Sequence, residues 1–138
     1  MADSIRIAQY FYVETPHQPG VGAAMLATLR DAGVNLLAFS GFPSGRKAQI
    51  DFIPENAETF RAAAKAAKWK LVGPKKCFLI GGADRPGAVA EIMTRLAQAK
   101  INVTAIDAVC ATGGSFGAIL WVEQRDVARA AKALGAAG

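Results

Sequence analysis

Residues 84–106, DRPGAVAEIMTRLAQAKINVTAI, repeat the pattern of residues 17–39, HQPGVGAAMLATLRDAGVNLLAF. A constant shift of 67 residues aligns the two stretches and places Pro19-Gly20 on Pro86-Gly87. The register resumes after the next turn with a shift of 69 residues, because the second copy has two more residues in its hairpin. Repetition at a fixed spacing is typical of repeated structural units. The chain is therefore predicted to contain two similar modules.

Both copies show the same order of elements. Apolar residues that alternate indicate strands, and apolar residues spaced along one helix face indicate helices. In the first copy this predicts strands at residues 5–13, 34–42, 47–53 and 69–72, with helices at 21–32 and 54–68. In the second copy it predicts strands at 76–81, 101–110 and 116–122, with helices at 87–100 and 124–134. No strand is predicted after the last helix.

Each module thus has the order β-α-β-β-α, with a closing strand only in the first. This is the order of the split β-α-β, ferredoxin-like arrangement, an antiparallel sheet with both helices on one face. The predicted fold class is α+β, with two ferredoxin-like βαββα(β) modules in tandem at residues 1–73 and 74–138. A module of about seventy residues is near the lower limit for independent stability, so we expect the modules to pack on each other or on a second chain.

The predicted sheets leave two surfaces uncovered. The face without helices would carry either Tyr10 and Tyr12 or Phe11 and Val13, depending on the register. The absent last strand of the second module would leave an open sheet edge. An apolar face and an open edge both favour association, so we expect a homodimer.

The composition is that of a globular chain with a modest positive charge. Hydrophobic residues make up 52% of it, and the formal net charge is +5. No apolar run reaches the roughly eighteen residues of a membrane-spanning helix, and the N-terminus lacks the features of a signal peptide. Cys77 and Cys110 have no metal-type spacing and are predicted to be reduced packing residues on strands. We therefore expect a cytoplasmic protein.

Basic residues gather between Arg61 and Lys76, a stretch that contains no acidic residue. Such a stretch could form a patch for nucleic acid or another anion. It could also be a helix C-terminus, where cations complement the helix dipole, followed by a solvated linker. The second interpretation is favoured because the charge is modest and local.

The loop Asp84-Arg85-Pro86-Gly87 has the residue types of a ligand site. It lies between a predicted strand and a predicted helix, and the first N–H groups of that helix point into the loop with the positive end of the dipole. A helix start of this kind binds carboxylates, and Asp84 adds a negative group for an ammonium. The loop therefore suits a free amino acid, although the same residues also serve as a helix cap and a turn.

Two asparagines occupy equivalent places in the repeat. Asn35 and Asn102 each follow the first helix of their module, at the start of the next strand. An asparagine there can fix the loop by hydrogen bonding or contact a ligand. For either residue taken alone, structural support is the favoured role.

The Asp-x-Pro-Gly loop, the helix after it and a strand start such as Ile-Asn-Val or Gly-Val-Asn resemble the ACT domain, the regulatory module of amino-acid-metabolising enzymes. The resemblance covers nearly the whole chain, as two tandem modules without a catalytic domain. It implies modules that pair side by side and bind small ligands, usually amino acids, at the interface beside the first loop and helix. By this resemblance the ligand-binding residues are Asp84, Arg85, Pro86, Gly87, Ala88 and Asn102, with Thr15, His17, Gln18, Gly20, Val21 and Asn35 at the equivalent place in the first module.

The first module departs from this pattern at one position. His17 stands where Asp84 stands in the second module. A neutral histidine cannot supply the negative charge that holds an ammonium, and a protonated one would repel it. The first loop therefore binds a different ligand or none. His17 is also a candidate pH-sensitive group, but an exposed loop residue is the favoured interpretation.

The sequence offers no constellation for catalysis. One histidine cannot make a typical zinc site, the nucleophile-elbow pattern G-x-S-x-G is absent, and the residues after Gly87 do not continue as a P-loop. We therefore expect a non-enzyme without a metal or cofactor, which binds a free amino acid and has a metabolic enzyme as a candidate partner.

Two other functions remain open from the sequence. One is a docking subunit that contacts an enzyme through the open sheet face and binds no ligand. The other is RNA binding, because RNA-recognition modules share this element order and stack bases on exposed aromatic residues of the third strand. Phe116 could serve in that way, but Ala118 stands where a second ring would be needed, so RNA binding is the weaker alternative.

Overall fold

The computed structural model describes residues 3–138 of the chain. These residues divide into two compact units. We call Gln9–Lys75 the first unit, and the chain up to Ala8 together with Lys76–Gly138 the second unit. The strands are hydrogen-bonded in the order β2-β3-β1-β4-β6-β5, and both β1 (Ser4–Pro16) and β4 (Val72–Ala83) contribute residues to each unit.

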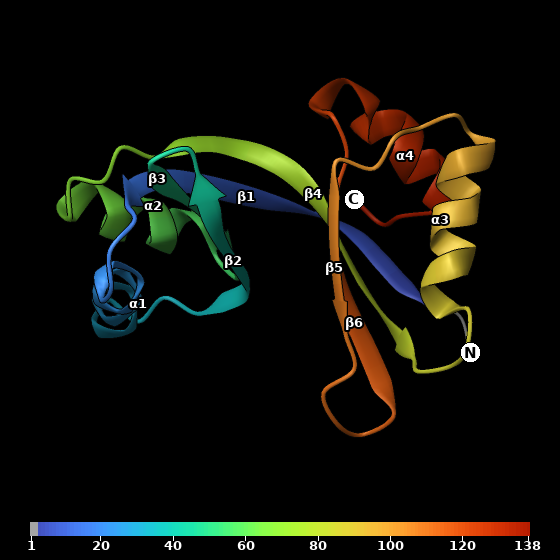
Figure 1. Cartoon of the computed structure of the whole chain (residues 1–138), viewed down its shortest axis with the longest axis horizontal. Helices are drawn as coiled ribbons and strands as arrows, with labels where there is room; N and C mark the ends of the chain where they lie inside the picture. Colours follow the sequence, from blue (N-terminus) through green and yellow to red (C-terminus); the bar gives the residue numbers. More distant parts are fainter. Residues whose placement is uncertain (1–2) are drawn as a thin grey trace. The chain divides into compact units, whose positions relative to one another are not determined.

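The first unit has a complete ferredoxin-like α+β fold. Its strands follow the order β2-β3-β1-β4, with β3 antiparallel to both β1 and β2. Both of its helices cover the same face of the sheet (Figure 1). Besides its parts of β1 and β4, the unit consists of α1 (Val21–Asp31), β2 (Leu36–Ser44), β3 (Lys47–Pro54) and α2 (Ala57–Ala66).

Aromatic rings fill the core of the first unit. Phe11 on β1, Phe52 on β3 and Phe60 on α2 are completely buried. The ring of Phe60 lies 5.1 Å from that of Phe11 and 5.3 Å from that of Phe52, centroid to centroid. Burying rings of this size is the largest favourable contribution that a small core can gain. These ring contacts therefore attach β1 and β3 to α2.

Helix α2 begins three residues later than the sequence pattern predicts. The side chain of Asn56 accepts hydrogen bonds from the backbone N–H groups of Glu58 at 3.0 Å and Thr59 at 3.1 Å. An asparagine in this position satisfies N–H groups that have no partner within the helix. The cap therefore sets the start of the helix at Ala57.

The second unit has the same fold, but its fourth strand comes from the start of the chain. Its strands follow the order β1-β4-β6-β5, so the N-terminal half of β1 occupies the place that β4 holds in the first unit. Ile5 on this strand is 7% exposed and belongs to the same core cluster as Phe78 and Leu96. The remaining elements are α3 (Ala88–Gln98), β5 (Ala105–Val109), β6 (Ser115–Trp121), a short 3-10 turn, η1 (Gln124–Asp126), and α4 (Val127–Leu134).

The open edge predicted for the second module is therefore wrong. The N-terminal half of β1 lies beside β4, and the chain near its C-terminus pairs with that half of β1 in turn. The N–H of Ile7 donates to the carbonyl of Ala137 at 2.9 Å, and the N–H of Ala137 donates to the carbonyl of Ile5 at 3.0 Å. The expectation of a dimer loses this part of its support.

Strand β4 joins two segments that the sequence pattern separates. It runs without interruption over Val72–Ala83, although Gly73 and Pro74 indicate a break. Strand β6 pairs only with Phe78–Ala83, so Pro74 lies outside the stretch that carries this ladder. The missing N–H of Pro74 therefore removes no hydrogen bond from the pairing of β4 with β6.

The register of β1 settles which aromatic residues face the helices. Phe11 and Val13 lie in the core of the first unit. Tyr10 is 9% exposed, and Tyr12 is half-buried with the ammonium of Lys75 5.4 Å from its ring centroid. Neither tyrosine is therefore the exposed apolar residue that the sequence led us to expect on the other face.

The structure also bears on two other expectations, which concern membrane-spanning helices and the two cysteines. None of the helices in the described part of the chain has the length and apolar character needed to cross a membrane. Cys77 is a buried residue of β4, as predicted for a packing cysteine, but Cys110 is exposed and follows the end of β5. The prediction that both cysteines are packing residues on strands is therefore wrong for Cys110.

Candidate functional site

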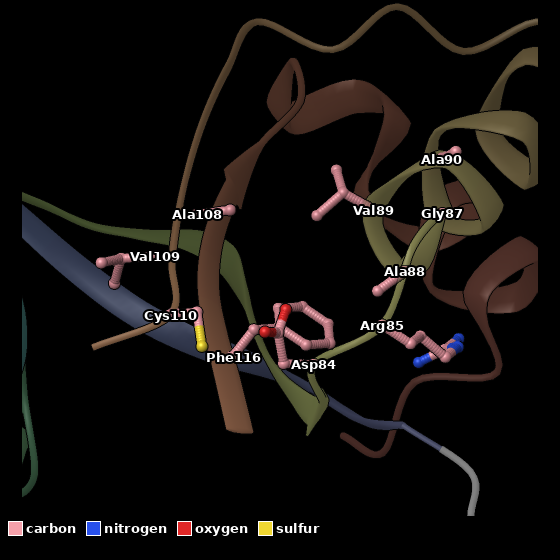
Figure 2. Close-up of a pocket in the computed structure, with 10 residues that line it drawn as sticks. All are labelled: Asp84, Arg85, Gly87, Ala88, Val89, Ala90, Ala108, Val109, Cys110 and Phe116. Carbon is pink, nitrogen blue, oxygen red and sulfur yellow. The ribbon is translucent and has the colours of Figure 1, made fainter. Parts of the chain in front are cut away.

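A pocket of about 380 Å³ lies in the second unit, beside the loop that joins β4 to α3 (Figure 2). Four residues that the sequence selected as ligand-binding contribute to it, namely Asp84, Arg85, Gly87 and Ala88. The opposite wall comes from the end of β5 and the start of β6. The remaining lining residues are Val89, Ala90, Ala108, Val109, Cys110 and Phe116.

The start of helix α3 supplies hydrogen-bond donors to this pocket. Gly87 precedes the helix with a φ of 81°, a left-handed conformation that glycine adopts without the steric cost of a Cβ. No side chain among the described residues caps the helix, and the first α-helical bond is the N–H of Glu91 to the carbonyl of Gly87, 3.0 Å. The N–H groups of Val89 and Ala90 precede that bond and lack a helical acceptor. Both residues line the pocket, so a bound anion could accept from them.

Asp84 lies in the pocket beside Cys110. Its backbone N–H donates to the carbonyl of Gly114 at 2.9 Å, which holds the loop against the β5–β6 hairpin. The hydrogen bond of the Cys110 thiol to the Asp84 carboxylate raises the pKa of this thiol. Figure 2 shows the sulfur and the carboxylate on the same side of the pocket. The carboxylate and the thiol therefore lie together at the wall of the pocket.

Most of the apolar wall of the pocket comes from residues that the sequence did not predict to bind a small ligand. Phe116 is 6% exposed and belongs to the core of the second unit. Val89 packs partly against the same core, whereas Val109 is 66% exposed. Because Phe116 is buried beneath the pocket, it is not the exposed stacking residue that RNA binding would require. The RNA alternative thus loses its main aromatic candidate.

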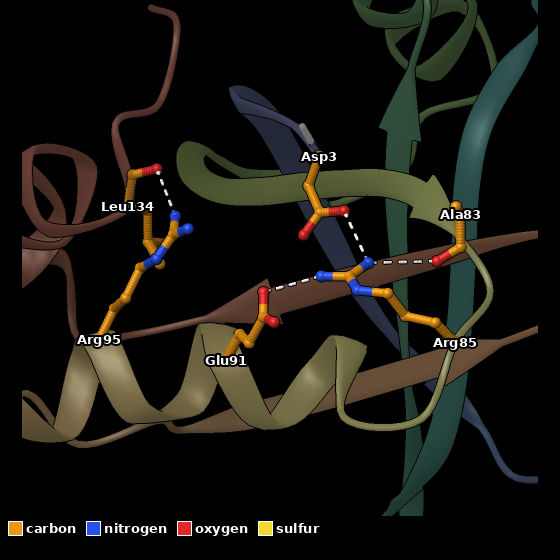
Figure 3. A network of polar contacts seen from close by, with 6 residues as sticks. All are labelled: Asp3, Ala83, Arg85, Glu91, Arg95 and Leu134. Carbon is orange, nitrogen blue, oxygen red and sulfur yellow. Dashed lines mark hydrogen bonds and ion pairs between the residues drawn. The ribbon is translucent and has the colours of Figure 1, made fainter. Parts of the chain in front are cut away.

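Arg85 belongs to the loop, but its guanidinium points away from this pocket (Figures 2 and 3). It donates to Asp3 Oδ1 at 3.3 Å, to the carbonyl of Ala83 at 3.2 Å and to Glu91 Oε2 at 2.7 Å. The hydrogen bond to Asp3, followed by that to Glu91, raises the pKa of Arg85. Its side chain therefore stabilises the loop, and only its other atoms contribute to the pocket wall.

Two predicted residues of the second module lie outside the pocket lining. Pro86 occupies the turn before α3, and Asn102 is exposed in the segment before β5. The lining includes neither residue. A ligand contact from Pro86 or Asn102 thus stays a prediction.

The equivalent loop of the first unit joins β1 to α1. His17 and Gln18 are exposed, and Gly20 caps α1 with a φ of 88° in the same left-handed conformation as Gly87. Val21 packs partly against the core, and Thr15 is 6% exposed. The Oγ1 atom of Thr15 has no hydrogen-bond partner among the described residues. The backbone of the repeat is therefore preserved here, while its chemistry differs.

Asn35 has a supporting role at the end of this helix. Its side-chain Nδ2 donates to Glu55 Oε2 at 3.0 Å, and its carbonyl accepts from the N–H of Glu55 at 2.9 Å. The two bonds tie the segment after α1 to the segment after β3. These two hydrogen bonds are consistent with the structural role that the sequence favoured for Asn35.

Metal ligation has no candidate cluster in the residues that the structure describes. No group of three or more His, Cys, Asp or Glu side chains comes together there. The chemistry on offer in the pocket is a carboxylate, backbone N–H donors and an apolar wall.

Comparison with models of protein families gives no match, and neither does comparison with curated protein sequences. Solved structures do match. Protein BT0572 from Bacteroides thetaiotaomicron is similar with a TM-score of 0.81 at 14% identity, over 95% of this chain and 88% of that one. The ligand-free regulatory subunit of aspartate kinase from Thermus thermophilus has a TM-score of 0.67 at 17% identity, over 98% and 95%. The corresponding subunit from Thermus flavus has a TM-score of 0.60 at 16% identity, over 97% and 94%. The chain thus has the ferredoxin-like, ACT-type fold of these regulatory subunits.

Proposed function

We propose that the protein is a regulatory binding protein whose ligand, a free amino acid or a similar small molecule, occupies the pocket beside Asp84. The observation that supports this function is the convergence of the Asp84 carboxylate and the unbonded N–H groups at the start of α3 on one pocket. The α-ammonium would lie against Asp84, and the α-carboxylate would accept from the N–H groups of Val89 and Ala90. The side chain of the ligand would contact Val109 and the edge of Phe116.

The regulatory mechanism would be linkage. A ligand that binds one arrangement of the protein more tightly shifts the population toward it, and this arrangement then changes contact with a partner. The similarity to regulatory subunits of aspartate kinase supports a metabolic enzyme as that partner. A binding protein of this kind needs no catalytic residues, metal or cofactor.

We also propose that the protein forms a homodimer in the cytoplasm. The edge strand β2 carries Leu37, Phe39 and Phe42, which are 39%, 41% and 44% exposed. Apolar side chains on an edge strand, which has one side without a neighbouring strand, favour pairing with a second chain. The exposed free thiol of Cys110 fits a reducing compartment. Light scattering that gives the mass of one chain at micromolar concentration would exclude the dimer.

Cys110 provides a direct assay for the ligand. It lines the pocket and is exposed, whereas Cys77 is buried, so a thiol reagent applied to the folded protein modifies Cys110. We expect the matching free amino acid, at millimolar concentration, to slow this modification and to raise the melting temperature. A ligand at about a hundred times its dissociation constant adds about 2.7 kcal/mol of stability.

The variant Asp84→Asn should lose both effects of the ligand, because its neutral amide cannot hold an ammonium. Asp107→Asn is the matched control, since Asp107 is exposed on β5 and does not line the pocket. Each variant is compared with its own ligand-free alkylation rate. A ligand that still protects Cys110 in Asp84→Asn with unchanged affinity would refute the assignment.

A further inference from the structure

The second unit contains another cavity, of about 290 Å³, which also borders Arg85. Figure 3 shows the polar contacts among the charged residues that line it. The cavity is bordered by the start of the chain, α3 and the end of α4. Arg85 is the one residue that it shares with the pocket beside Asp84. The residues that line it are Asp3, Ile5, Arg85, Glu91, Arg95, Leu134 and Gly135.

One end of this cavity carries a net negative charge. Asp3 and Glu91 both pair with the guanidinium of Arg85, at 3.3 Å and 2.7 Å, so two carboxylates share one cation. The Asp3 side chain is only 7% exposed. Its Oδ1 atom accepts a hydrogen bond from Arg85, whose guanidinium also donates to Glu91 and to the carbonyl of Ala83. One guanidinium therefore serves two carboxylates at this end of the cavity.

The position of Asp3 depends on Gly82, whose backbone conformation does not itself require a glycine. Gly82 is not in the left-handed region, so its backbone would accept other residues. A Cβ at Gly82 would collide with the Asp3 carboxylate and would approach the ring of Phe116 to 3.0 Å. The absence of a side chain at Gly82 is therefore what lets the Asp3 carboxylate sit at the cavity wall.

The other end of the cavity carries a positive charge with spare donors. Arg95 lies one turn after Glu91 on α3 and donates to the carbonyl of Leu134 at 3.5 Å, the upper limit for such a bond. Its other N–H groups have no acceptor among the described residues. A guanidinium presents five donors in a planar fork that fits a carboxylate. Figure 3 shows Arg95 separate from the group formed by Asp3, Arg85 and Glu91.

We propose that this cavity is a second binding site, for a small zwitterion that carries an ammonium and a carboxylate. The ammonium would approach Asp3 and Glu91, and the carboxylate would pair with Arg95. A simple anion would be attracted by Arg95 but repelled by the carboxylates of Asp3 and Glu91. A simple cation would be attracted by the two carboxylates but repelled by Arg95. A molecule with both groups satisfies both ends of the cavity, which is at the small end of the range for ligand pockets, about 300 Å³.

The test uses the full chain with Asp84→Asn, so that the pocket beside Asp84 cannot hold an ammonium. The isotope-labelled protein is titrated to millimolar concentrations with the common amino acids and with β-alanine and γ-aminobutyrate, and the Nε–H signals of Arg85 and Arg95 are followed by NMR. Acetate and methylammonium are the single-charge controls. We expect saturable shifts at Arg95 with at least one zwitterion and much weaker shifts with either control.

Two further substitutions, each combined with Asp84→Asn, test the positive and the negative end of the cavity separately. Arg95→Gln should weaken binding of the zwitterion about tenfold or more, because a charge-assisted pair is lost, while the remaining signals show that the fold is intact. Glu91→Gln should weaken the zwitterion but not acetate. Absence of saturable shifts with every compound, an undiminished affinity in Arg95→Gln, or equal binding of acetate would each overturn the proposal. Because Asp84 is already replaced, these results are independent of ligand binding at the other pocket.

Discussion

Replacing Ile5 with alanine tests which unit the start of the chain belongs to. Ile5 lies on the same continuous strand as Phe11, yet it is buried in the core of the second unit, with Phe78 and Leu96. It is 7% exposed, so the substitution removes almost a full isoleucine side chain from the core and leaves a cavity. Such changes cost about 2–5 kcal/mol. The loss should fall on the second unit, although the sequence pattern assigns residue 5 to the first.

Ile50→Ala is the matched control. Ile50 is 6% exposed, lies on β3 and belongs to the core cluster of the first unit. The two variants therefore remove the same atoms from equally buried strand positions in different units. Equilibrium unfolding should give losses of similar size, so the position of each loss along the chain is what distinguishes them.

Hydrogen exchange followed by mass spectrometry locates the loss. A decrease of about 3 kcal/mol in the free energy of opening speeds exchange about 100-fold. Ile5→Ala should produce this acceleration in peptides from α3, β6 and α4, and Ile50→Ala in peptides from α1, β3 and α2. If Ile5→Ala accelerated exchange only within residues 9–75, or uniformly over the whole chain, the assignment of β1 to both units would be refuted.

Three further changes have defined outcomes. Burial raises the pKa of Asp51 above its ordinary value of 3.8, so the folded protein binds the proton more readily than the unfolded chain. The free energy of unfolding therefore falls as the pH rises from 3.8 through the raised pKa of the folded state. Asp51→Asn should remove this decrease, as measured by urea unfolding across the acidic range. The carboxylate of Asp84 raises the pKa of Cys110, so Asp84→Asn should speed alkylation of Cys110 near neutral pH, and an unchanged rate would contradict the thiol–carboxylate contact. A methyl group at Gly82 collides with the Asp3 carboxylate, so Gly82→Ala should lower the free energy of unfolding by about 1–3 kcal/mol, and an undiminished denaturation midpoint would show that Asp3 moves aside.

The repeat in the sequence was sufficient to predict the fold class. The paired Pro-Gly loops and the alternation of apolar residues follow from local rules, and the α+β, ferredoxin-like arrangement that they predict is confirmed. The exchange of strand ends did not follow from them. Nothing in residues 4–8 shows that they pair with a strand more than seventy positions later, because strand pairing is decided by packing in three dimensions and not by local pattern.

The sequence selected residues on the loop side of the pocket and none of the opposite wall as candidate ligand-binding residues. Asp84 and Gly87 were identifiable because a helix start and an acidic residue have a chemical meaning in the sequence. Ala108 and Cys110 have no motif, and the sequence placed Cys110 inside a strand, where it would pack. Strand β5 ends at Val109, and Cys110, which follows it, is exposed like most residues of this edge strand. The hydrogen-bond partners of Arg85 were equally hidden, because Asp3 lies 82 residues away in the chain.

Arg85 is the residue of the repeated loop that is least suited to testing either binding site. Other atoms of Arg85 border one cavity while its guanidinium borders the other, so a substitution there changes both at once. It would also leave the buried Asp3 carboxylate without its cation, a loss that lowers stability whatever the protein binds. Asp84 and Arg95 do not have this ambiguity, because each lines one cavity and neither neutralises a buried charge. A difference in ligand binding between Asp84→Asn and Arg95→Gln therefore reports on the site itself, provided that both variants unfold at the wild-type temperature.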